Sequence, residues 1–140
     1  MGQMLTVQVE QVGPSTATAR ARTHTVLVDR PVGKGGEDRG PLGGEYLLVG
    51  LGGCFLSNLL AAIRARDAAV SHVTIGVSGT IDGPPDRFTA FGLSVAAVHA
   101  DADQVRKLIA IAANACAVTN TLRQSAVVTF EFEGVSVTSE

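Results

Sequence analysis

The chain has 140 residues, a formal net charge of −2, and 17% charged against 46% hydrophobic residues. A chain of this length forms one domain with its own hydrophobic core, so we expect a single domain over residues 1–140. The scattered basic residues exclude a basic footprint for nucleic acid. Soluble domains usually carry about 25% charged residues, and we expect a subunit interface to absorb the excess apolar surface.

The N-terminal segment predicts a half-buried strand, because apolar and polar residues alternate from Leu5 to Glu10. This alternation leaves no apolar core for a secretion signal, so we expect a cytoplasmic protein. A turn at 13–15 leads to a second predicted strand from about Thr16 to Val28. One face of it is either a solvent-facing strand end or carries an arginine that leans over a buried anionic site. Period two places on this face Arg20, Arg22, His24, Val26 and Val28.

Residues 29–44 predict a loop, because they are rich in glycine and proline. The glycines lack the G-x-x-x-x-G-K-[ST] spacing of a phosphate-binding loop, so nucleotide binding is not supported and no cofactor is expected. A long helix is expected to begin near Glu45. A carboxylate in the first turn suits the positive end of the helix dipole.

The centre of this helix is an uncharged run from Tyr46 to Ile63, with Cys54 in its middle. Its length reaches the lower limit of about 17 residues for a membrane-spanning helix. We reject a membrane span, because the run holds Gly50, Ser57 and further small or polar residues, and strand-like alternation follows it. A helix that is apolar on nearly all sides is then the buried central helix of a globular domain.

Alternation of apolar and polar residues predicts two further strands, at 73–81 and 91–97, joined as a hairpin by a loop of about five to six residues. Asp101, followed three residues later by Gln104, predicts the N-cap of a second helix. Asn114 is a candidate interruption of that helix, and a last strand is expected at 128–132. The apolar face of the second helix is expected to hold Val105, Ile109, Ala112 and Cys116.

The predicted order is β-β-α-β-β-α-β, a mixed α+β domain with mostly antiparallel pairing. Its two cysteines, Cys54 and Cys116, are too few for a disulfide scaffold. In a reducing compartment they are either inert core residues or a redox pair. If both helices pack on one face of the same sheet, the thiols can meet, and a disulfide needs Cα atoms within about 7 Å.

Two segments resemble the cysteine motifs of the OsmC/Ohr family (osmotically inducible protein C and organic hydroperoxide resistance proteins). GPLGGEYLLVGLGGC, residues 40–54, resembles the first motif, roughly G-P-x-P-x-E-L-L-L-A-A-L-G-x-C. ACAVTNTL, residues 115–122, resembles the second, roughly C-P-V-S-x-x-L. The chain departs from the pattern where Gly43 or Gly44 replaces a proline and where Ala117 replaces another.

The resemblance implies a thiol peroxidase that reduces organic hydroperoxides, with Cys54 as the peroxidatic and Cys116 as the resolving cysteine. A thiolate becomes a sulfenic acid on attacking a peroxide, and a second thiol condenses with it to a disulfide. The resemblance also implies an intertwined homodimer, and a dithiol reductant such as a lipoyl-bearing protein or a small thiol.

A buried apolar cysteine is inert unless a positive group favours its thiolate. The resemblance implies an arginine held by a carboxylate. Glu45 matches the family's helix-start glutamate, and the candidates for the arginine are Arg22, Arg20 and Arg30. On a straight helix Glu45 and Cys54 lie half a turn out of phase, so sharing one arginine requires a kink, a bridge around the helix end or a second subunit. Glu45 acting only on the helix dipole remains an alternative.

A second hypothesis is an OsmC-like module without peroxidase activity that binds a small hydrophobic ligand in the same apolar cleft. The histidines are isolated, and no spacing of histidine and cysteine supports a metal site. The identity of the peroxide, the reductant and the arginine stays open.

Overall fold

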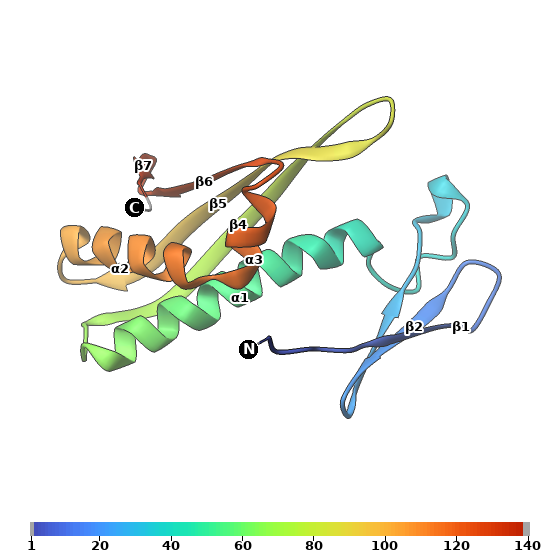
Figure 1. Ribbon diagram of the computed structural model, residues 1–140, viewed down its shortest axis with the longest axis horizontal. Helices are drawn as coiled ribbons and strands as arrows, with labels where there is room; N and C mark the ends of the chain where they lie inside the picture. Colours follow the sequence, from blue (N-terminus) through green and yellow to red (C-terminus); the bar gives the residue numbers. More distant parts are fainter. Residues whose placement is uncertain (1, 139–140) are drawn as a thin grey trace. The chain divides into compact units, whose positions relative to one another are not determined.

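The computed structural model describes residues 2–138 and consists of two compact units, one ending at Leu47 and one beginning at Leu48. The boundary falls inside helix α1 (Gly43–Ala65), so the long central helix contributes to both units. Figure 1 colours the first unit from blue to cyan and the second from green to red. The mixed α+β class expected from the sequence is confirmed.

The first unit contains a three-stranded antiparallel sheet in the order β1-β2-β3. Its strands are β1 (Gln8–Gln11), β2 (Ala17–Ala21) and β3 (His24–Val28), and the short 3₁₀ helix η1 (Val32–Lys34) follows. The sheet is formed entirely by neighbours in sequence, so it is a meander, joined by residues 12–16 and by the two-residue turn at 22–23.

The single strand predicted over residues 16–28 is wrong, because the chain reverses at Arg22 and forms a hairpin. Arg22 adopts a φ of +56°, a conformation that lets a two-residue loop close. In the hairpin register Arg20 pairs with Thr25, one position from the pair made by His24, so Arg20 and His24 point to opposite faces. The predicted common face of arginines and valines therefore does not exist.

The loop after β3 is organised by Asp29, which is buried although it is a carboxylate. Asp29 accepts hydrogen bonds from the Thr16 hydroxyl at 2.8 Å and from the backbone N–H groups of Arg30 at 2.7 Å and Arg39 at 3.2 Å. Burial alone would raise the pKa of Asp29, but these hydrogen bonds outweigh it and hold the pKa well below its usual range. The carboxylate thus ties both ends of the loop to the sheet.

The second unit contains a four-stranded sheet in the order β4-β5-β6-β7. Strands β4 (Val70–Asp82) and β5 (Arg87–His99) form the long antiparallel hairpin that the sequence predicts. Strand β6 (Val127–Phe132) pairs parallel to β5, and the short β7 (Val135–Val137), which the sequence analysis missed, returns antiparallel. The parallel pair requires a crossover, and helices supply it.

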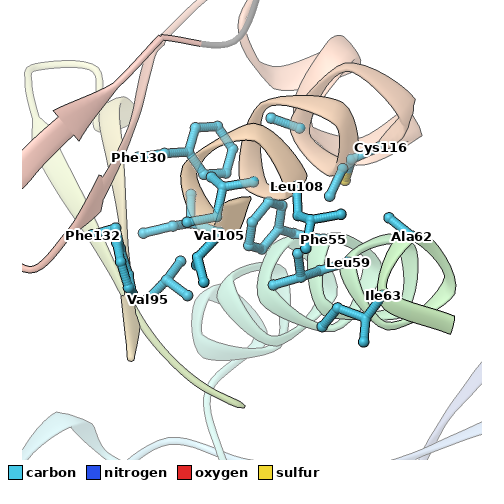
Figure 2. Close-up of a cluster of buried hydrophobic side chains, with 14 of the residues drawn as sticks. Phe55, Leu59, Ala62, Ile63, Val95, Val105, Leu108, Cys116, Phe130 and Phe132 are labelled. Atoms are coloured by element: carbon cyan, nitrogen blue, oxygen red, sulfur yellow. The ribbon is translucent and has the colours of Figure 1, made fainter. Parts of the chain in front are cut away.

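Helix α1 beyond Leu48, helix α2 (Ala102–Ala115) and helix α3 (Ala117–Leu122) pack around one core with this sheet (Figure 1). Figure 2 shows Phe55 of α1 at the centre of the buried cluster, near Leu108 of α2 and Phe130 of β6, with Leu59 beside it on α1. The rings of Phe55 and Phe130 have centroids 4.8 Å apart, and Phe55 is 0% exposed. Helix α1 is long and apolar enough to cross a membrane by length and composition, and the core contact accounts for the apolar residues on its buried side, among them Leu51, Phe55 and Leu59.

Asp101 caps α2 as predicted, accepting from the N–H groups of Asp103 and Gln104. The predicted apolar face of α2 is also confirmed, since Val105, Ile109, Ala112 and Cys116 are all buried. The helix ends at Ala115, however, so Cys116 lies at the junction with α3 and not inside a helix. Helix α3 was not predicted, because Ala117–Leu122 is too short for its periodicity to be recognised.

Candidate functional site

Cys54 lies midway along α1, half-buried, and packs against the hydrophobic core of the second unit. Asn58, four residues further along, shares its side of the helix. The Asn58 amide donates to the Cys54 carbonyl oxygen at 2.9 Å and stands 3.9 Å from the Cys54 Sγ. A polar donor is therefore placed next to a thiol that a small molecule can reach.

Cys116 is 0% exposed and occupies the one-residue gap between α2 and α3. Its backbone is extended, with φ −80° and ψ 112°, so the chain changes direction at this residue. Its Sγ accepts a hydrogen bond from the backbone N–H of Thr119 at 3.4 Å, in the first turn of α3. Figure 2 shows Cys116 at the edge of the buried cluster.

The two thiols interact with each other. Burial raises the pKa of the Cys116 thiol, the backbone N–H and the side chain of Thr119 lower it, and the neighbouring Cys54 raises it further. The net direction is upward, so Cys116 rests as a neutral thiol at neutral pH. The structure thus brings together the two cysteines that the sequence singles out, one partly accessible and the other enclosed.

Glu45 lies in the first turn of α1 and is exposed. Its Oε1 accepts from the backbone N–H of Leu42 at 2.8 Å, which satisfies a donor at the helix start. This contact is of the kind expected if Glu45 acts only at the start of the helix, which was one of the two alternatives given for it above. Glu45 belongs to the unit that ends at Leu47, whereas both cysteines belong to the other.

The three candidate arginines, Arg20, Arg22 and Arg30, are exposed residues of the first unit. Arg22 forms the hairpin loop, Arg20 lies on β2, and Arg30 follows the buried Asp29. That one of them, Arg22 first among them, favours the Cys54 thiolate stays a prediction.

Sequence reasoning missed Asn58 and Thr119, the polar residues nearest to each sulfur. The sequence could have indicated them by spacing. Asn58 follows Cys54 by four residues and Thr119 follows Cys116 by three, and such offsets bring side chains together on one side of a helical turn. Within residues 2–138, no group of three or more histidine, cysteine or acidic side chains is arranged to hold a metal ion. The described site holds two neighbouring thiols in apolar surroundings.

The chain is thus a mixed α+β protein with one cysteine on its central helix and a second at a helix junction. Residues 35–131 match the family model described as OsmC-like protein, so the chain belongs to the OsmC-like family. No curated protein sequence matches the chain.

Solved structures share the fold at low sequence identity. An OsmC-like protein from Mycoplasma pneumoniae is 17% identical, with a TM-score of 0.83 over 94% of this chain and 97% of its own. An organic hydroperoxide resistance protein from Elizabethkingia anophelis is 19% identical, with a TM-score of 0.75 over 94% and 98%. Another, from Legionella pneumophila, is described as organic hydroperoxide resistance protein OsmC and is 15% identical, with a TM-score of 0.74 over 93% and 96%.

Proposed function

We propose that this chain is a thiol-dependent peroxidase that reduces organic hydroperoxides through Cys54 and Cys116. The observation that carries the proposal is the pairing of a half-buried thiol with a fully buried one inside an apolar core. Two structural neighbours named organic hydroperoxide resistance proteins support it at the level of the fold.

In the first step the Cys54 thiolate attacks one oxygen of the hydroperoxide, and the O–O bond breaks. The sulfur becomes a sulfenic acid, and the leaving alkoxide takes a proton to become an alcohol. Cys54 suits this step because its side chain is partly accessible, whereas Cys116 is 0% exposed. The apolar surroundings of Cys54 favour bulky organic hydroperoxides over hydrogen peroxide.

In the second step the Cys116 thiolate attacks the Cys54 sulfur, forming the disulfide and releasing hydroxide, which is protonated to water. A dithiol reductant then restores both thiols by thiol–disulfide exchange and leaves as its own disulfide. A lipoyl-bearing protein or a small dithiol fits the role of reductant. We also propose that the protein acts in the cytoplasm. We further propose that Arg22, held in place by the Glu45 carboxylate, is the cation that favours the Cys54 thiolate.

The test is to replace each cysteine and measure peroxide consumption with dithiothreitol as reductant. Cys54→Ser should abolish consumption, because a serine hydroxyl is far too weakly acidic to act as the nucleophile at neutral pH. Cys116→Ser should consume about one equivalent of cumene hydroperoxide and stall as a sulfenic acid that over-oxidises. Normal turnover by both variants would overturn the thiol-pair mechanism.

Thiol titration separates the peroxidase from an OsmC-like module that only binds a hydrophobic ligand. One equivalent of alkyl hydroperoxide should remove both free thiols of the wild-type chain, and dithiothreitol should restore them. Unchanged thiols after peroxide would exclude the peroxidase and favour the binding module.

A further inference from the structure

Thr119 is placed at the Cys116 sulfur by the helix junction. It is the third residue after Cys116, and its backbone N–H donates to the Cys116 Sγ at 3.4 Å. Because α3 begins directly after Cys116, the first turn of the helix brings Thr119 back to the cysteine. Thr119 is 0% exposed, so both of its donors are buried beside the sulfur-bearing junction and away from the protein surface.

The Thr119 hydroxyl is a buried polar group without an ordinary hydrogen-bond partner among residues 2–138. A buried hydroxyl left unsatisfied costs roughly 1–3 kcal/mol, and valine fills the same shape without that cost. The side chain of Thr119 nevertheless lowers the pKa of Cys116, in the same direction as the backbone N–H that donates to the sulfur at 3.4 Å. Both donors of Thr119 therefore act on the Cys116 thiol.

We propose that Thr119 is a positioning residue for the resolving step, whose hydroxyl donates to the Cys116 thiolate as that thiolate forms. The inference rests on the proposed peroxidase function and deepens it. Cys116 carries negative charge only after it loses its proton and before it bonds to Cys54. In that interval the two donors of Thr119 face the charge, and the hydroxyl gains the partner that it lacks in the resting state.

The balance of the step shows where Thr119 acts and where it does not. The S–S bond forms as the S–O bond of the Cys54 sulfenic acid breaks, hydroxide leaves, and the proton released earlier by Cys116 completes a water molecule. Attack of Cys54 on the peroxide precedes any charge on Cys116. Loss of the Thr119 hydroxyl should therefore slow disulfide formation and leave sulfenic acid formation unchanged.

The experiment compares Thr119→Val, which removes the hydroxyl and keeps the backbone N–H, with the matched variant Thr119→Ser, which retains both donors. Single-turnover stopped flow with one equivalent of cumene hydroperoxide follows sulfenic acid and then disulfide formation between pH 5 and 9. Thr119→Val should slow disulfide formation about tenfold at pH 7, the order expected for a lost hydrogen bond to a charged group. It should also shift the pH profile of that step upward. Thr119→Ser should stay within about twofold of wild type.

Two further measurements, a titration of Cys116 and a thermal melt, test the role of Thr119 without relying on turnover. In a Cys54→Ser background, ultraviolet absorbance of the thiolate titrates Cys116 without any peroxide, and Thr119→Val should move that titration to higher pH. Because the hydroxyl is unsatisfied at rest, Thr119→Val should melt no lower than wild type. An unmoved titration, or wild-type disulfide formation by Thr119→Val, would overturn the role of Thr119 alone. If the titration moves but the chain with both cysteines consumes no peroxide, the peroxidase function is overturned instead, and the resolving role with it.

Discussion

The two cysteines differ most in their access to solvent and in the polar group that each one meets. Cys54 is half-buried beside the Asn58 amide, whereas Cys116 is fully enclosed and faces Thr119. A hydroperoxide therefore reaches Cys54 first, and burial protects Cys116 from direct oxidation. This asymmetry assigns the two chemical roles within the proposed mechanism without reference to the order of the cysteines in the chain.

At the same scale, Arg22→Met tests the cation proposed for Cys54. In a Cys116→Ser background at pH 7, it should slow alkylation of Cys54 by iodoacetamide about tenfold, because a guanidinium favours the reactive thiolate. Arg20→Met and Arg30→Met serve as matched controls and should react at the wild-type rate. If one of these controls slows and Arg22→Met does not, the role moves to that arginine.

The sequence identified the two reacting thiols because cysteine motifs are short, local and chemically distinctive. It did not identify Asn58 and Thr119, because asparagine and threonine are common and only the helix geometry aims them at sulfur. It misplaced Arg22, because arginine carries no turn signal and a φ of +56° is unusual for it. The missed features depend on backbone conformation more than on residue type.

At the scale of the element, α1 approaches β4 closely at Gly52. A Cβ built on Gly52 would lie 2.7 Å from the Cγ2 of Val77, whereas one on Gly50 would meet nothing within 4 Å. Gly52→Ala should lower the free energy of unfolding by about 1 to 2 kcal/mol, since overpacking costs more than the gain in helix propensity. Gly50→Ala, the matched control, should raise it by about 0.5–1 kcal/mol. Urea unfolding of the two variants checks this, and equal stabilities would contradict the close approach.

The loop that leads into α1 depends on the buried Asp29, and this dependence has a defined direction in pH. Because its folded-state pKa lies below the unfolded value of about 3.9, Asp29 stabilises the fold above that pH. The contribution is lost as pH falls from about 4 toward the folded-state pKa. Asp29→Asn should therefore lower the urea midpoint at pH 7, and the deficit should shrink at pH 3.

The control for Asp29 is Asp38→Asn in the same loop. Asp38 is exposed and has a φ of +55°, a conformation that asparagine adopts readily. Its substitution should leave the urea midpoint within experimental error at both pH values. A deficit of Asp29→Asn that stayed constant from pH 7 to pH 3 would show that the ionised carboxylate is not what holds the loop.

Element prediction succeeded where burial imposes a period and failed where it does not. The faces of α2, β5 and β6 are anchored by buried Ile109, Leu93 and Phe130, so their periodicities are visible in the sequence. Strands β2 and β3 belong to a sheet with little buried side-chain area, and nothing in their pattern revealed the reversal at Arg22. Tertiary contacts decided where the other helices and strands end, including the break between α2 and α3 at Cys116.

At the scale of the whole molecule, much apolar surface stays uncovered in a single chain. The N-terminal segment predicted to be half-buried is exposed, with Leu5 at 84% and Val7 at 68%. On α1, Val49 is 62% and Leu60 39% exposed. Apolar surface of this extent on a single chain marks an interaction site. The low charged fraction of the sequence pointed to the same need.

From these surfaces we predict an obligate homodimer, in which a second copy of the chain covers the exposed residues of α1 and of the N-terminal segment. Obligate dimers bury roughly 2,000 Å² or more, an area that these two regions together are suited to supply. Sedimentation at low micromolar concentration should show a species of twice the 14.4 kDa chain mass and no monomer. Val49→Glu, a charge placed on the exposed side of α1, should release monomer or aggregate, because a buried unpaired carboxylate costs several kcal/mol. A wild-type chain that sediments as a folded monomer would contradict the prediction. An uncovered helix of this composition is expected to aggregate, so a stable monomer would also show that the exposed side of α1 needs no partner.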